Sequence, residues 1–182
     1  MSSKARPALP SSSSERLSLG VVAYPEGGDI EDLLARFALS LRGQGVAVGG
    51  LLQRSSREVN GRPRMEMIDI ASGEIILISQ NLGGKSSACC VDLTGVADAS
   101  TYLRRAIAAR PDLLIINKFS GLEAKGGGLR AEFLDALASG LPVLTGLSDR
   151  NRAAFEEMAQ GAGEYLAATD QALHDWWAGT LP

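Results

Sequence analysis

The 182-residue chain is predicted to form a three-layer α/β domain with a mainly parallel sheet and an added antiparallel hairpin. Three observations support this class. Short apolar runs alternate with helical patterns along the chain, as in βαβ proteins. Residues 112–116 form an apolar run without polar alternation, which is typical of a buried parallel strand. A polar, glycine-rich segment at residues 117–130 follows this run, and ligands bind open α/β sheets at the carboxyl ends of their strands.

Composition limits the classes of partner. The net charge of −3 offers no basic footprint for nucleic acid, and no apolar run approaches the roughly 18 residues that span a bilayer. Residues 1–16 have no apolar core of a secretory signal and are expected to be a disordered tail, which leaves residues 17–182 as one domain. The adjacent Cys89 and Cys90 cannot build a disulfide framework, so a cytoplasmic location is expected.

The first half of the chain opens with a strand at residues 17–23 and a glycine-containing break. A helix is predicted over residues 30–44, with Asp29 at its N-cap and Gly45 as its left-handed stop. Its apolar positions keep to one face with a 3.6-residue period. These positions are Ile30, Leu33, Leu34, Phe37, Ala38 and Leu41.

A second strand is expected at residues 46–53. The polar segment 54–64 contains an Asn-Gly turn signal and is predicted to lead into an exposed hairpin with strands at residues 65–70 and 74–79. Residues 80–95 are rich in Gly and Ser without periodicity and predict a long loop. The other expected elements are helices over residues 96–109, 129–139, 149–160 and 169–178, and strands over residues 142–147 and 164–166.

The order strand, glycine loop, helix, strand resembles the small P-loop nucleoside triphosphatases. Two motifs, residues 89–92 in the long loop and residues 117–130 after the central strand, resemble more closely those of an uncharacterised bacterial family that is related to those enzymes and often encoded beside molybdate-uptake genes. That family carries C-R-L-D in the long loop and N-[KR]-F-G-x-x-E-A-x-G-x-G-x-R after the central strand. The resemblance covers residues 17–161 and implies a P-loop-type fold and an accessory or sensing role in molybdenum metabolism, but no settled activity.

Most positions of the two motifs are present. In the first motif Cys89 and Asp92 match, while Cys90 and Val91 replace its arginine and leucine. In the second motif Ser120 replaces the first glycine. The matching residues of the second motif are Asn117, Lys118, Phe119, Glu123, Ala124, Gly126, Gly128 and Arg130.

The Walker A chemistry is degenerate. A working P-loop needs a lysine on the phosphates and a hydroxyl on Mg²⁺, but residues 24–32 place Ile30 and Glu31 at these two positions. The nearby carboxylates are predicted to cap the helix dipole, with a cation or amine site as the alternative. They are Glu26, Asp29, Glu31 and Asp32.

Triphosphatases place an acid at the end of the central strand, where this chain has Asn117 and Lys118. This exchange predicts a loss of metal-dependent hydrolysis and the gain of an anion site, whereas the alternative is a turn former beside a solvated lysine. Residues 79–86 match a displaced P-loop motif except that Ser79 replaces its first glycine, but no amphipathic helix follows them. They are therefore interpreted as a loop that brings Lys85, Cys89 and Asp92 to the same cleft. Cys89, Cys90 and His174 lack zinc spacing.

The resulting hypothesis is a P-loop-like protein that binds a small anionic ligand, a nucleotide or an oxyanion, without hydrolysing it. Two alternatives remain open: a metal-dependent phosphohydrolase that uses Asp92 and Glu123, and a ligand-free interaction module. No nucleic-acid or membrane partner is expected, a homodimer stays open, and the sequence names no cofactor, no metal site and no catalytic residue. The predicted ligand-binding residues are Lys85, Cys89, Asp92, Asn117, Lys118, Glu123, Gly126, Gly128 and Arg130.

Overall fold

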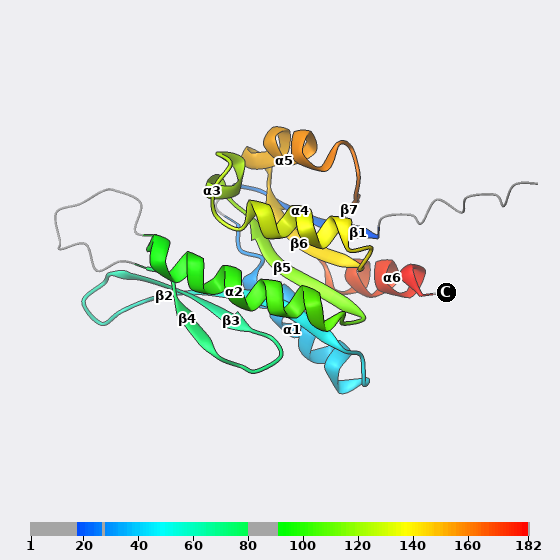
Figure 1. The fold of residues 1–182 in the computed structure, drawn as a ribbon, viewed down its shortest axis with the longest axis horizontal. Helices are drawn as coiled ribbons and strands as arrows, with labels where there is room; N and C mark the ends of the chain where they lie inside the picture. Colours follow the sequence, from blue (N-terminus) through cyan, green and yellow to red (C-terminus); the bar gives the residue numbers. More distant parts are fainter. Residues whose placement is uncertain (1–17, 27, 80–90, 182) are drawn as a thin grey trace, which may run out of the picture.

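The computed structural model describes residues 18–26, 28–79 and 91–181. Its sheet has the strand order β4-β3-β2-β5-β6-β1-β7 (Figure 1). Neighbouring strands from β2 to β7 pair in parallel, and β3 and β4 extend the sheet as antiparallel strands, so the predicted fold class is confirmed. The strands are β1 (Leu19–Tyr24), β2 (Val48–Arg57), β3 (Pro63–Asp69), β4 (Ile75–Leu77), β5 (Leu113–Phe119), β6 (Val143–Ser148) and β7 (Glu164–Leu166).

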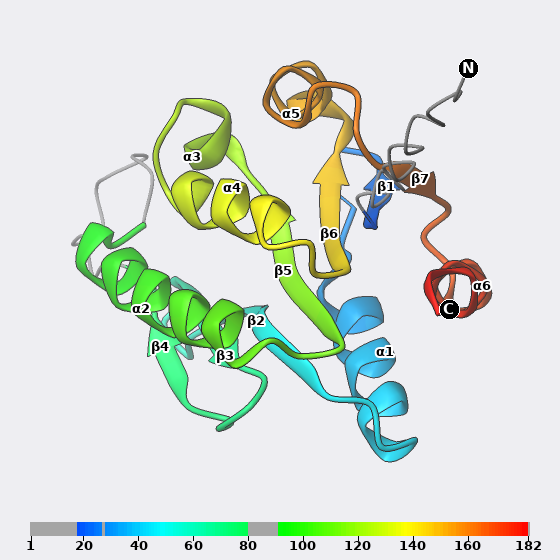
Figure 2. The ribbon, with the colours of Figure 1, turned by 45° about the vertical axis from the view of Figure 1, so that its right-hand side comes forward.

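Helices cover both faces of this sheet and form two apolar cores. Helices α1 (Glu31–Gly43) and α6 (Asp170–Thr180) pack on one face. Helices α2 (Leu93–Ala109), α4 (Arg130–Ala138) and α5 (Arg152–Ala159) pack on the other, as Figure 2 shows. Among the described residues, none of the helices combines the length and apolar character that crossing a membrane requires.

Strand β5 is the centre of the sheet, between β2 and β6. Its first four residues are completely or almost completely buried, because they supply aliphatic side chains to both cores. At its carboxyl end Phe119 packs edge-to-face against Phe133 and Phe155, with ring centroids 5.9 and 5.2 Å away. The pairing with β6 shifts register between Ile116 and Lys118, so Asn117 lies at a bulge. Strand β1 is parallel to β5 in the same sheet, as predicted.

Several element boundaries differ from the sequence prediction. Helix α2 begins at Leu93, so the end of the predicted loop is helical. Ile30, and not Asp29, is the N-cap of α1, although the Asp29 carboxylate accepts a hydrogen bond from the Glu31 amide at 2.7 Å. The helix expected over residues 149–160 begins as a 3-10 turn, η1 (Asp149–Asn151), before α5. A short helix, α3 (Gly121–Ala124), was not predicted, because four residues are too few to show a helical period.

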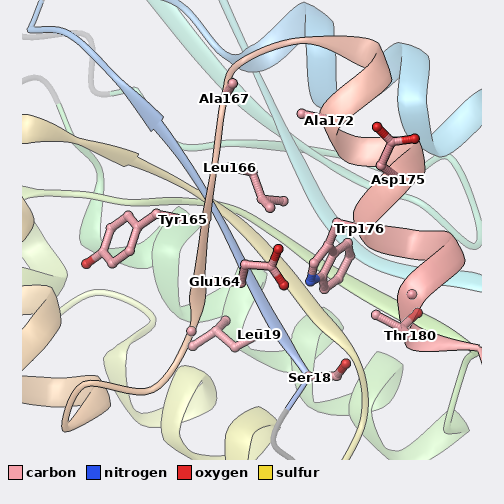
Figure 3. Close-up of a pocket in the computed structure, with 12 residues that line it drawn as sticks. Ser18, Leu19, Glu164, Tyr165, Leu166, Ala167, Ala172, Asp175, Trp176 and Thr180 are labelled. Atoms are coloured by element: carbon pink, nitrogen blue, oxygen red, sulfur yellow. The ribbon is translucent and has the colours of Figure 1, made fainter.

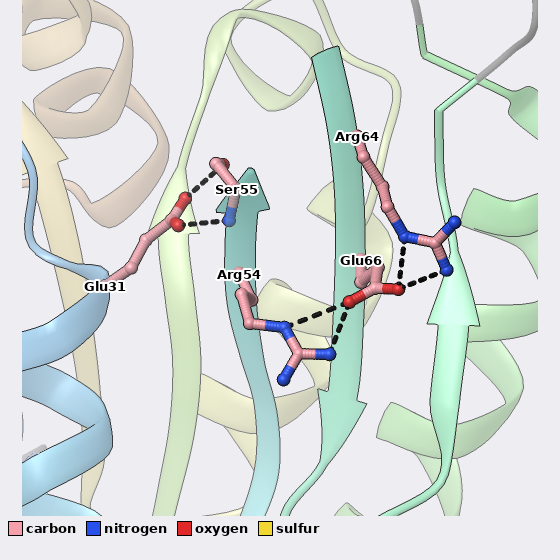
Figure 4. Close-up of polar contacts among 5 residues, drawn as sticks. All are labelled: Glu31, Arg54, Ser55, Arg64 and Glu66. Atoms are coloured by element: carbon pink, nitrogen blue, oxygen red, sulfur yellow. Dashed lines mark hydrogen bonds and ion pairs between the residues drawn. The ribbon is translucent and has the colours of Figure 1, made fainter. Parts of the chain in front are cut away.

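The polar segment after residue 53 is part of a regular ladder between β2 and β3, which extends to the pair Arg57–Pro63. Two of its arginines pair with one carboxylate: Glu66, with 5% of its side chain exposed, accepts hydrogen bonds from Arg54 Nε at 3.0 Å and Arg64 Nε at 2.7 Å (Figure 4). Hydrogen bonds from Arg54 and Arg64 hold the pKa of Glu66 below its usual value, against the opposing effect of burial. Paired charges therefore allow a polar sequence to form strands here.

Candidate functional site

The carboxyl ends of β1, β5 and β6 surround a cavity of about 360 Å³ at one edge of the sheet. Two cationic residues, Lys118 and Arg150, line it together with two serines, of which Ser120 donates a hydrogen bond from its hydroxyl to the Glu123 carboxylate at 2.5 Å. This is the edge at which the sequence predicted a ligand, because parallel strands end together. The lining residues are Tyr24, Glu26, Gly28, Lys118, Phe119, Ser120, Gly121, Ser148, Arg150 and Asn151.

Lys118 lines this cavity and forms an ion pair with Glu31. Its ammonium lies 2.9 Å from Oε1 of Glu31, whose residue is only 6% exposed. The same carboxylate accepts hydrogen bonds from the Ser55 amide at 2.6 Å and the Ser55 hydroxyl at 2.7 Å (Figure 4). Glu31 therefore joins the start of α1 to the ends of β2 and β5, which corrects the interpretation that it only caps the helix. Lys118 is 24% exposed and is not a freely solvated loop lysine.

Asn117 precedes this lysine and is 4% exposed. Neither its amide nitrogen nor its amide oxygen has a hydrogen-bond partner among the described residues. Leaving a buried polar group unpaired costs about 1–3 kcal/mol. The backbone here is closely packed, since a Cβ on Gly146 would lie 3.0 Å from the Asn117 carbonyl oxygen. Asn117 does not line the cavity itself, but it directly precedes Lys118, which does, so this costly polar group is a candidate ligand contact.

The glycine-rich loop after β5 is organised around the carboxylate of Glu123. This carboxylate accepts hydrogen bonds from the amides of Ser120 and Leu129, both at 2.9 Å. Gly128 has φ +60°, and a Cβ at this position would overlap the carboxylate. The carbonyl of Glu123 accepts hydrogen bonds from the Gly126 amide at 3.0 Å and from Arg130 Nη1 at 3.1 Å.

The structure therefore brings four predicted site residues together in one loop, around Glu123. None of them lines the cavity that contains Lys118, and the hydrogen bonds described above stay within the loop. Their contact with a ligand stays a prediction. They are Glu123, Gly126, Gly128 and Arg130.

Of the three site residues predicted in the long loop, only Asp92 lies within the described residues. Asp92 is the N-cap of α2, where its Oδ1 accepts a hydrogen bond from the Thr94 amide at 2.9 Å. Lys85 and Cys89 lie outside the described residues. His174 packs edge-to-face on Phe37, with centroids 5.0 Å apart.

Comparison with known proteins assigns the chain to a family. The model of DUF2478, described as a protein of unknown function, matches residues 19–176. The chain belongs to the DUF2478 family. The family that the loop motif predicted is thereby confirmed.

One curated protein and one solved structure are similar to this DUF2478 protein. It is 39% identical over 163 residues to "Molybdenum import ATP-binding protein ModC 2" of Bradyrhizobium diazoefficiens. That match covers 89% of this chain but only 18% of the relative, so the chain spans less than a fifth of the relative's length. The solution structure of a human cancer-related nucleoside triphosphatase superposes with a TM-score of 0.62 and 16% identity, covering 88% of this chain and 93% of that one. The latter likeness establishes the triphosphatase-type fold.

Of the ten lining residues of the DUF2478 site, only Lys118 is among the residues that the sequence predicted as ligand contacts. The other nine include Tyr24, Ser148, Arg150 and Asn151. The signal was present, since three of them follow the predicted strand 142–147 and the carboxyl ends of parallel strands meet at one edge. Arg150 is held loosely, because its Nη1 lies 3.4 Å from Oε1 of Glu26 with both side chains largely exposed. Burial, and then the charges of Glu31 and Asp29, raise the pKa of Tyr24, so its phenol stays protonated.

A larger hollow of about 730 Å³ lies between β7 and α6 (Figure 3). Its lining residues include Glu164, Asp175 and Trp176, with no lysine or arginine among them. Two carboxylates without a cation disfavour an anion there. The cavity at the carboxyl ends of the strands is therefore the better candidate for the predicted ligand.

Proposed function

We propose that this DUF2478 protein binds a small anion at the carboxyl edge of its sheet and does not hydrolyse it. One observation carries the proposal: Lys118 and Arg150 line the same cavity of about 360 Å³, together with Ser148, whose hydroxyl oxygen accepts from the Asn151 side-chain amide at 3.2 Å and whose O–H can donate. Two cations and a hydroxyl together offer charge-assisted and neutral hydrogen bonds to an oxyanion or a phosphate group. The volume is in the range of small-molecule sites.

The positions of the triphosphatase chemistry support binding without turnover. Ile30 is 1% exposed and belongs to the apolar core, so the phosphate-binding lysine is replaced by a packing residue. Asn117 replaces the acid that would hold Mg²⁺. The carboxylates of Asp92 and Glu123 already accept backbone hydrogen bonds within the chain. These engagements disfavour the rearranged-carboxylate alternative.

The ModC relative narrows the class of anion. A protein with "molybdenum import" in its name contains a segment that is homologous to nearly all of this chain. We take molybdate as the first ligand to test and an accessory or sensing part in molybdenum metabolism as the role. Nucleotide phosphates share the oxyanion chemistry and form the second class of probe.

Replacing Arg150 by glutamine is expected to weaken molybdate binding about tenfold or more, because charge-assisted hydrogen bonds contribute about 1.5–3 kcal/mol and each 1.4 kcal/mol is a factor of ten. Isothermal titration calorimetry with molybdate, sulfate, ATP and GTP measures this. The matched control is Arg152→Gln, since Arg152 pairs with Asp149 at 3.0 Å and stacks over Tyr165 outside the cavity. Equal affinities in both variants would contradict the site, and tighter binding of ATP than of molybdate would make a nucleotide the ligand.

Hydrolysis of ATP and GTP in the presence of Mg²⁺ is expected to stay at the background rate. A phosphate-release assay on protein purified over two successive columns measures it. The variants Asp92→Asn and Glu123→Gln serve as comparisons, because these carboxylates are the candidates for rearranged metal chemistry. Turnover that survives the second column and disappears in Asp92→Asn would replace binding by phosphohydrolysis.

A further inference from the structure

Two carboxylates stand next to the cations of the proposed anion site. Glu31 pairs with Lys118 at 2.9 Å, and Glu26 pairs with Arg150 at 3.4 Å. Their surroundings differ sharply. The Glu31 side chain is 7% exposed and that of Lys118 is 24% exposed, whereas Glu26 and Arg150 are 70% and 65% exposed. Water and salt therefore screen the charge of Glu26 but reach that of Glu31 poorly.

The position of Glu31 is determined by three donors from two other elements. The Ser55 amide and hydroxyl approach the carboxylate from β2, and the Lys118 ammonium approaches it from β5. An ammonium has three N–H donors, and the pair with Glu31 accounts for one of them. Lys118 can therefore donate to a ligand in the cavity while Glu31 cancels its charge.

We propose that Glu31 sets the affinity and the charge preference of the anion site. The inference rests on the proposed function. An anion that binds Lys118 meets an ion pair with no net charge, and it is repelled by a buried carboxylate whose field is weakly screened. This repulsion grows with the charge of the ligand, so Glu31 penalises a dianion more than a monoanion. The site is weaker than its two cations alone would make it, and it responds only when its anion is abundant.

Two tetrahedral oxyanions of different charge test this assignment: molybdate, a dianion, and perrhenate, a monoanion. In Glu31→Gln we expect perrhenate to bind about tenfold more tightly and molybdate about a hundredfold more tightly, since the Coulomb energy scales with ligand charge. Glutamine keeps an oxygen that accepts from Ser55. The matched control is Glu26→Gln, which removes the same charge at an exposed position and should change either affinity by less than about threefold. Calorimetric titration of all three proteins gives the affinities.

The outcomes separate the inference from the proposed function. Equal tightening for the two anions, or no tightening while Arg150→Gln still weakens binding, overturns the role of Glu31 and leaves the site standing. Loss of any effect of Arg150→Gln overturns the site itself. If Glu31→Gln does not fold, the double variant Glu31→Gln with Lys118→Met can be used. It removes both charges of the pair, and proteins tolerate the replacement of a whole buried ion pair better than the loss of one partner. It should keep the ratio of molybdate to perrhenate affinity within about threefold of the wild type, because the pair is neutral in both proteins. A tenfold change in that ratio would overturn the inference.

Discussion

The variant Gly50→Ala is expected to lose about 3 kcal/mol or more of folding free energy, which is a large share of the stability of a domain of this size. Gly50 has φ +106° and pairs with Ile115 in the centre of the sheet. A Cβ here would overlap the carbonyl oxygen of Ile115 and lie 2.9 Å from its backbone nitrogen. Neither strand can move away without breaking the β2–β5 ladder. Thermal unfolding followed by circular dichroism measures the loss.

The adjacent glycine is the control for this prediction. A Cβ on Gly49 would lie 3.0 Å from Cγ of Pro111, which is a side-chain atom, and its φ is not positive. Gly49→Ala should therefore cost about 1 kcal/mol or less, as small overpacking changes do when a neighbour can yield. Similar losses in the two variants would show that the close approach of Gly50 to Ile115 does not decide stability.

Replacing Asn117 by leucine should stabilise the ligand-free protein by about 1–3 kcal/mol and weaken molybdate binding about tenfold. The stabilisation is expected because the buried amide has no partner among the described residues, and its desolvation cost disappears with a leucine of similar shape. The loss of binding is expected because a buried polar group that lowers stability is retained where it forms a hydrogen bond to a ligand. Chemical denaturation and calorimetric titration of the same protein measure the two effects.

Ser100→Ala provides the opposite case for comparison. Ser100 is also buried, but its hydroxyl donates to Glu132 at 2.6 Å, so its removal should destabilise the protein by about 1 kcal/mol. If Asn117→Leu destabilises the protein as Ser100→Ala does, Asn117 has a structural partner. If it stabilises the protein without changing the molybdate affinity, the amide does not contact the ligand.

The fold class followed from local patterns in the sequence. The apolar run at residues 112–116 predicted the central strand, which the structure confirms as part of β5 between β2 and β6. Helical periods predicted α1, α2, α4 and α6 to within a few residues at each end. These predictions succeed because the 2-residue period of strands and the 3.6-residue period of helices can be recognised within a short stretch of sequence, and burial of one face is what stabilises each element. The motif around Asn117 likewise indicated the family that comparison confirms.

The same local patterns could not show how the loop after β5 closes. Three glycines and an arginine suggested a cradle for an external anion. The structure shows Gly126, Gly128 and Arg130 arranged around Glu123, whose carboxylate and carbonyl accept hydrogen bonds from both ends of the loop, while their contact with an anion stays a prediction. A sequence names the donors and acceptors of such a loop, but the backbone dihedral angles decide which of them face inward.

The sequence by itself determined which residues stand at the two Walker positions, Ile30 and Asn117, and these two residues predict a degenerate site because a lysine and an acid are needed there. Only the tertiary structure decided which charges meet. Glu31 reaches Ser55 across 24 positions and Lys118 across 87, and Glu26 meets Arg150 across 124. The strand order β2-β5-β6-β1 brings these residues together at one edge of the sheet. That order depends on how the helices bury both faces of the sheet, which is a property of the whole chain that no local period contains.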